Sequence, residues 1–83
     1  MTGRIQIDFE PGEGALLRMV GLVERRGFAV RGLAMHAAQG KGSISLDVDP
    51  RDPGRRLEVV AGQLRRLIEV RSVSIFPSGQ GAS

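Results

Sequence analysis

Hydrophobic and polar residues alternate along four stretches of the chain. In residues 4–9 every second position is apolar, so Ile5, Ile7 and Phe9 share one side and the polar residues share the other. This two-residue period is typical of a β-strand with one buried face. The same alternation recurs later in the chain, and it predicts three further strands over residues 28–36, 43–49 and 70–76.

Two other stretches repeat at the spacing of a helix. Residues 14–26 carry Leu16, Val20 and Val23 on one stripe, with Leu17 alongside. Two arginines and then Gly27 follow, as is typical where a helix ends. A second apolar stripe predicts another amphipathic helix, and its members are Leu57, Val60, Ala61, Leu64 and Ile68, widened by Leu67.

Several glycines lie within the predicted strands and helices or between them. The apolar parity of residues 28–36 changes at Gly32, which predicts a β-bulge that flips the register. Residues 39–42, Gln-Gly-Lys-Gly, predict a hairpin turn between the second and third strands. Gly21 and Gly62 lie inside the predicted helices, where glycine costs about 1 kcal/mol relative to alanine. We interpret both as points where the helices approach each other or the sheet closely.

The predicted elements follow one another in the order β-α-β-β-α-β. Each strand has one apolar face and each helix has one apolar stripe, so two layers bury them all. We therefore predict an α+β, ferredoxin-like fold with both helices on one face of a four-stranded antiparallel sheet. Residues 1–76 form this single domain, and the small, polar residues 77–83 are expected to be a disordered tail.

The charge of the chain changes this picture little. The pI is near 11.0, yet the net charge is only +3. The chain has eleven arginines, one lysine, and no tyrosine or cysteine. Few groups therefore lose a proton between neutral pH and the range where arginine titrates, so a small excess of positive charge gives a high pI. The arginine pairs alternate with glutamates at helix-neighbour spacing, which indicates solvated helix faces. With no apolar signal region or membrane-length run, we expect a soluble, cytoplasmic protein without a membrane partner.

Composition also argues against several activities that ferredoxin-like folds support. The absence of cysteine excludes iron–sulfur and thiolate metal sites, and three phenylalanines without tyrosine or tryptophan are too few for an RNA-stacking sheet. The chain has no asparagine, the residue on which acylphosphatase-type hydrolysis relies to position water. His36 is the only histidine, and Asp47 with Asp49 has no third ligand or partner base. We predict no catalytic residue, no metal, no cofactor and no nucleic-acid partner.

The turn before the first helix is the best candidate for a binding site. Gly12 and Gly14 let the backbone approach a ligand, and the first N–H groups of a helix have no partner within it. Such a helix start favours an anion, for example the carboxylate of an amino acid. The candidate residues are Pro11, Gly12, Glu13, Gly14 and Ala15. Two alternatives stay open: the turn only reverses the chain, or Glu10 and Glu13 occupy these donors as internal caps.

The residues around this turn resemble an ACT domain, and more narrowly the small regulatory subunit of acetolactate (acetohydroxyacid) synthase. That family's pattern is G-A-L-x-R-x-x-G-L-x-x-R-R-G-[FY], with a leucine five residues after the aromatic. It matches Gly14-Ala15-Leu16, Arg18, Gly21-Leu22, Arg26-Gly27-Phe28 and Leu33. A weaker match, to the family's segment between the second helix and the fourth strand, covers Gln63-Leu64 through Val70, then Val73.

The resemblance implies a regulatory subunit that performs no chemistry itself. Its partner would be the thiamine-diphosphate-dependent catalytic subunit of acetolactate synthase, which acts in branched-chain amino acid biosynthesis. It also implies a homodimer formed through strand two and a branched-chain amino acid effector held at the first turn. The long apolar strand two is predicted to be a sheet edge. The expected dimer edge is Phe28, Val30, Gly32, Leu33 and Met35.

Two departures from the family pattern matter. Valine-sensing members carry an asparagine three positions before the residue that matches Gly14, and here that position is Pro11, which lacks a side-chain amide and a backbone N–H. The C-terminal domain of longer members is also missing from this sequence. We therefore predict weak or absent valine sensing. The alternative is a stand-alone ACT-type, amino-acid-binding regulatory module for another partner.

Overall fold

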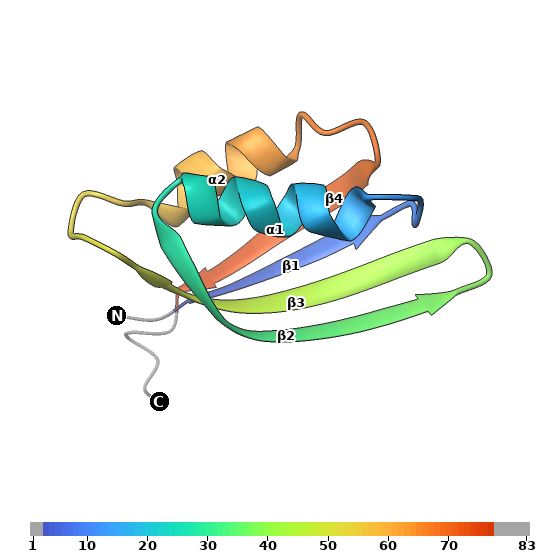
Figure 1. Ribbon diagram of the computed structural model, residues 1–83, viewed down its shortest axis with the longest axis horizontal. Helices are drawn as coiled ribbons and strands as arrows, with labels where there is room; N and C mark the ends of the chain where they lie inside the picture. Colours follow the sequence, from blue (N-terminus) through green and yellow to red (C-terminus); the bar gives the residue numbers. More distant parts are fainter. Residues whose placement is uncertain (1–2, 78–83) are drawn as a thin grey trace.

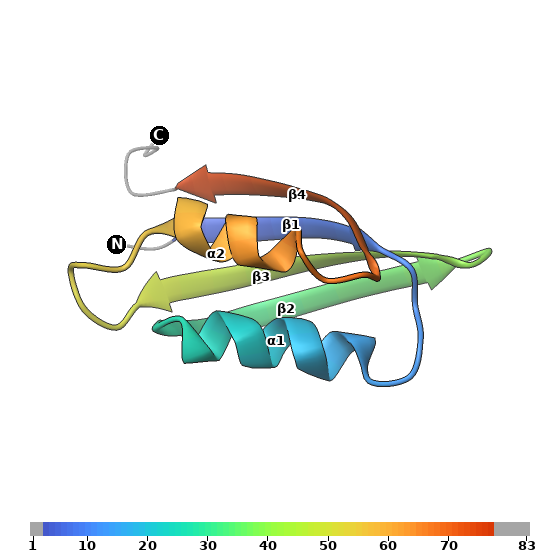
Figure 2. The ribbon, with the colours of Figure 1, turned by 90° about the horizontal axis from the view of Figure 1, so that it is seen from above.

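The computed structural model describes residues 3–77 of the 83-residue chain. Both helices lie on one side of a four-stranded sheet, which leaves the other side of the sheet uncovered (Figures 1 and 2). This is the predicted α+β, ferredoxin-like arrangement, and it is confirmed. In chain order the elements are β1 (Gly3–Phe9), α1 (Ala15–Arg25), β2 (Phe28–Ala38), β3 (Lys41–Pro50), α2 (Leu57–Leu64) and β4 (Val70–Pro77).

The sheet has the strand order β2-β3-β1-β4, and all neighbours are antiparallel. The two edges of the sheet are therefore β2 and β4. In β2 the pairing shifts between Val30 and Gly32, which face Val48 and Asp47, so Arg31 is an extra, unpaired residue. The predicted bulge at this position is confirmed. It turns Leu33 and Met35 onto the helix side of the sheet, because they pair with residues of β3 that face the core.

A two-residue turn joins β2 to β3. Ala38 pairs with Lys41, and the intervening Gln39 and Gly40 have φ values of 56° and 75°. Two consecutive residues in the left-handed region match the right-handed twist of the flanking strands. The resulting hairpin extends beyond the helices at one end of the molecule (Figure 1).

The core lies between the helices and the sheet. Ile5, Ile7 and Phe9 of β1 are fully buried, as the alternating pattern predicts. The strands and helices around them contribute the rest of the core, namely Ala15, Met19, Leu22, Val23, Phe28, Ile44, Leu46, Val48, Val60, Ala61, Leu64 and Val73.

The buried face of α1 differs from the predicted one. Met19 and Leu22 are buried, whereas Leu17 is exposed and Leu16 and Val20 only border the core. Apolar residues occupy both sides of this helix, so the sequence pattern alone left its rotation ambiguous. In the structure Ala15, Met19, Leu22 and Val23 face the core, and Arg18 forms an ion pair with Glu69.

Helix α2 ends earlier than predicted. It stops at Leu64, and the backbone then forms tight i→i−3 bonds from Arg66 to Gln63 and from Leu67 to Leu64. Ile68 is consequently 96% exposed instead of continuing the apolar stripe. The chain has to leave the helix here because β4 begins at Val70 and runs along β1.

Two further predictions are corrected at the level of single residues. A Cβ atom at Gly62 would meet nothing within 4 Å, and one at Gly21 would meet only the end of the Arg25 side chain at 3.3 Å. These glycines therefore do not mark close approach of backbones. Pro77 is the last residue of β4. The predicted tail otherwise lies outside the described residues, as do residues 1 and 2. Among residues 3–77, neither helix is long and apolar enough to cross a membrane.

Candidate functional site

The candidate site is the loop from Glu10 to Gly14, which joins β1 to α1. It is exposed throughout, and it lies at the same end of the molecule as the β2–β3 turn (Figures 1 and 2). Gly14 occupies the N-cap position with φ of 79°, and the N–H of Ala15 donates to the carbonyl oxygen of Gly12 at 3.2 Å. A β-carbon at Gly12 would meet nothing within 4 Å, so a ligand has open access to the backbone there.

No side chain caps the start of α1. The carboxylate of Glu10 accepts a hydrogen bond from Nη2 of Arg71 at 2.7 Å instead. The alternative in which Glu10 or Glu13 caps the helix internally is therefore wrong. The first N–H groups of the helix lack a side-chain acceptor, which is the electrostatic arrangement that attracts an anion.

Glu69 fastens this loop to the rest of the domain. Its backbone carbonyl accepts a hydrogen bond from the N–H of Glu10 at 2.8 Å, and its carboxylate accepts one from Nε of Arg18 at 2.7 Å. Arg18 also donates to the carbonyl oxygen of Glu13 at 3.4 Å. The two ends of the loop are thus tied to one residue between α2 and β4.

Arg18 keeps Glu69 charged although this residue is only 9% exposed. The pKa of the Glu69 carboxyl lies below its ordinary value, first because Arg18 donates to it and next because the Glu69 backbone N–H does. Burial opposes this shift by disfavouring the charged form. The ion pair is therefore intact at neutral pH.

The structure has a loop where the sequence predicted the turn before α1, but no sequence pattern indicated a role for Glu69. The pair joins positions 51 apart in the chain, and no local pattern connects them. The only available signal was a carboxylate between the apolar residues Ile68 and Val70. Arg18, which lies in the stretch that resembles the acetolactate synthase small subunit, is the ion-pair partner of Glu69.

The five predicted dimer-edge residues fall into three groups by their exposure. Phe28 is only 2% exposed, and its side chain packs in the core of its own protomer. Val30 and Gly32 are partly buried beside the bulge. Leu33 and Met35 are 47% and 44% exposed. Only the second half of β2 thus presents apolar side chains to solvent.

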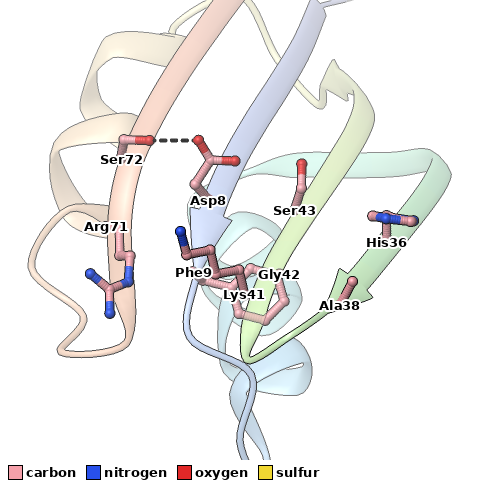
Figure 3. Close-up of a pocket in the computed structure, with 9 residues that line it drawn as sticks. All are labelled: Asp8, Phe9, His36, Ala38, Lys41, Gly42, Ser43, Arg71 and Ser72. Atoms are coloured by element: carbon pink, nitrogen blue, oxygen red, sulfur yellow. Dashed lines mark hydrogen bonds between the residues drawn. The ribbon is translucent and has the colours of Figure 1, made fainter.

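A hollow of about 470 Å³ lies at the same end of the sheet, on the uncovered side. Figure 3 shows Asp8 and Ser72 on one side of it and His36 on the other. Ser72 Oγ donates to Asp8 Oδ2 at 3.0 Å, but no hydrogen bond joins His36 to either residue within the described part of the chain. His36 is on β2 and is separated from Asp8 by β3, so these groups do not form the hydroxyl–imidazole–carboxylate relay that nucleophilic catalysis requires.

The remaining candidates for chemistry are also dispersed. Asp47 and Asp49 form ion pairs with Arg4 and Arg31 at 2.8 Å and 2.9 Å. Over residues 3–77, no three His, Asp or Glu side chains gather as a metal site would require. Asp47 and Asp49 are therefore engaged in separate ion pairs and do not form a shared carboxylate site.

The fold and the site define a class of protein: a two-layer ferredoxin-like domain with an open loop at the start of its first helix. The sequence model of the ACT domain family matches residues 11–73, and the chain belongs to this family. ACT domains are regulatory, non-catalytic modules that bind amino acids.

Solved structures with the same fold are similar to this chain at low sequence identity. The ACT domain from GTP pyrophosphokinase of Chlorobium tepidum superposes with a TM-score of 0.76 at 18% identity, over 92% of this chain and 97% of that one. An ACT domain protein from Streptococcus pneumoniae gives 0.76 at 11% identity, over 94% and 90%. The ligand-free regulatory subunit of aspartate kinase from Thermus thermophilus gives 0.61 at 13% identity, over 93% and 51%. None of the proteins with curated functions matches the sequence.

Proposed function

We propose that this protein is a non-catalytic regulatory small subunit of acetolactate synthase. In this role it binds and activates the thiamine-diphosphate-dependent large subunit in branched-chain amino acid biosynthesis. The observation that carries the proposal is the block from Gly14 to Leu33, which follows that subunit family's pattern through α1 and into β2. The second match, from Gln63 to Val73, includes Glu69, which ties the loop before α1 to the rest of the domain.

The proposed effector site is the stretch from Pro11 to Ala15. Its support is the uncapped start of α1 and the free space beside Gly12, which suit the carboxylate of an amino acid. Pro11 contributes neither an amide side chain nor a backbone N–H to such a ligand. Feedback inhibition by valine is therefore proposed to be weak or absent.

Isothermal titration with valine, leucine and isoleucine tests this part of the proposal. We expect no binding below the millimolar range for the natural sequence, because Pro11 leaves the polar groups of the ligand without a partner. The variant Pro11→Asn restores an amide at this position and is expected to bind valine at least tenfold more tightly. Glu13→Asn places the same amide two residues away and serves as the control. Micromolar affinity of the natural chain for valine contradicts the proposal.

Reconstitution with the catalytic subunit tests the proposed activity directly. Adding the chain to purified large subunit is expected to raise acetolactate output several-fold, and valine is expected to change that output little. Unchanged output over a range of subunit ratios contradicts the role as an activator. Output that rises but then falls sharply with valine supports the partner and rejects the weak effector response.

The alternative is a stand-alone ACT module that senses an amino acid for a different partner. Its support is that proteins of different function share this fold, among them the aspartate kinase regulatory subunit and the ACT domain of a GTP pyrophosphokinase. Affinity capture of the complex formed under native conditions separates the two proposals. Recovery of the large synthase subunit supports the first, and reproducible recovery of another enzyme in its place supports the second.

The proposed homodimer forms through β2. This strand is a sheet edge, and its second half carries the exposed Leu33 and Met35. A second copy related by a twofold axis pairs the same edge with itself and covers both side chains. Burial of this edge also supplements the small core of an 83-residue chain.

A further inference from the structure

The two edges of the sheet differ in how accessible their main chain is. Both β2 and β4 pair on one side only, so each has N–H and C=O groups directed away from the sheet. Such groups are a template on which another strand can add. Proteins with two equally open edges can extend from copy to copy without limit, because head-to-tail contacts that do not close produce filaments.

The β4 edge is obstructed by Arg65. This residue directly follows α2, and its Nη2 donates a hydrogen bond to the carbonyl oxygen of Val73 at 3.0 Å. Val73 lies in the middle of β4, so the guanidinium occupies an acceptor that an incoming strand requires. Pairing of β4 is also interrupted near its start, where Arg71 is an extra residue between Val70 and Ser72. Pro77 ends the strand without an N–H donor.

The β2 edge lacks these obstructions after its bulge. From Gly32 to Ala38 every residue pairs in register with β3, which leaves seven consecutive residues of regular edge. This segment contains no lysine, arginine, aspartate or glutamate. Within the described residues, no side chain donates to or accepts from its main chain. It therefore remains available for strand addition.

We propose that Arg65 closes the β4 edge to strand addition, so that an extended strand from a second copy is admitted only at β2. The side chain blocks the edge because its hydrogen bond to the Val73 carbonyl oxygen competes with the main-chain hydrogen bonds that an added strand would form. Edge pairing then stops at two copies instead of continuing along the sheet. The closure of β4 does not depend on the proposed enzyme partner.

Removal of the Arg65 side chain tests this inference in the full chain. Sedimentation velocity over a hundredfold range of concentration is expected to show species larger than those of the natural protein for Arg65→Ala. Arg66→Ala removes the neighbouring exposed arginine and is expected to leave the distribution unchanged. Arg65→Lys retains a donor that can reach a carbonyl, so it is expected to suppress most of the additional association.

Two further measurements keep the outcome interpretable. Circular dichroism confirms that each variant is folded, and hydrogen exchange of the Arg65→Ala assemblies is expected to show new protection in β4. A folded Arg65→Ala protein with the natural mass distribution overturns the inference, as does additional association without protection in β4. If Arg65→Ala unfolds, Arg65→Met replaces it in the same measurements, because methionine keeps a long side chain but has no hydrogen-bond donor.

The proposed β2 dimer is tested separately in the same series. Leu33→Glu places a charge on the β2 edge and is expected to weaken the dimer at least tenfold, whereas Leu17→Glu on the outer face of α1 is not. If the dimer proposal is wrong and the Arg65 inference is right, the natural protein is monomeric and Arg65→Ala still forms larger species. Failure of the Arg65 inference leaves the dimer intact and without larger species.

Discussion

Gly42→Ala is expected to lower the free energy of unfolding by about 1–3 kcal/mol, because the new methyl group enters occupied space. A Cβ atom at Gly42 would lie 2.8 Å and 2.9 Å from ring atoms of Phe9. Phe9 is 1% exposed and is enclosed by the core, so its ring has little room to shift. Chemical denaturation with urea measures the loss.

Gly62→Ala is the matched control for this substitution. It adds the same methyl group inside α2, where nothing lies within 4 Å. Alanine is expected to raise the free energy of unfolding by about 0.5–1 kcal/mol through its higher helix propensity. Opposite signs for the two glycines are therefore expected. Equal effects of the two substitutions contradict the tight contact between Gly42 and Phe9.

Arg18→Ala is expected to lower the free energy of unfolding by about 1–2 kcal/mol at neutral pH, because it leaves the carboxylate of Glu69 without its cation. The loss of stability is not expected to be larger, because the Arg18 side chain is 53% exposed and solvent screens its interaction with Glu69. The loop before α1 also loses one of its attachments, and its backbone amides are expected to exchange faster with solvent.

The contribution of this pair depends on pH in a defined direction. The pKa of Glu69 is lowered in the folded protein, so its stabilising effect is present above the ordinary value near 4.5 and is lost as the pH falls through the folded value. The difference between the natural protein and Arg18→Ala is therefore expected to shrink in acid. Unfolding curves at pH 7 and pH 3 measure it.

Arg4→Ala provides the control for this pH series. Its partner is Asp47, and both side chains are about half exposed, so the loss is expected to stay below about 1 kcal/mol. An Arg18→Ala effect that is equally large at pH 7 and pH 3 contradicts the assignment to the charged Glu69.

Much of the architecture followed from local pattern. Ile44, Leu46 and Val48 alternate with polar residues, and they are buried as predicted because a strand's side chains alternate between its faces. The bulge at Arg31 and Gly32 was visible as a change of apolar parity. The open loop before α1 was visible as two glycines ahead of an amphipathic segment.

The errors have a common physical origin. Leu17 and Ile68 each fit an apolar stripe in sequence, yet both are exposed because neighbouring elements determine where a helix turns and ends. Hydrophobic periodicity predicts which residues of a helix or strand could share a buried face. The packing of neighbouring elements determines which of them are buried.

The sequence by itself determined the order of the strands and helices, the two-layer fold and the glycine-rich turn at the start of α1. These features depend on residues within a few positions of one another, and their periodicity is readable in the chain. The tertiary structure alone decided that Glu69 fastens that turn through Arg18, that Phe9 fills the space above Gly42, and that Arg65 reaches the main chain of β4. The first two of these contacts join residues distant in sequence, and the third requires a helix end to lie beside a strand edge. All three contacts form only when the helices are packed on the sheet.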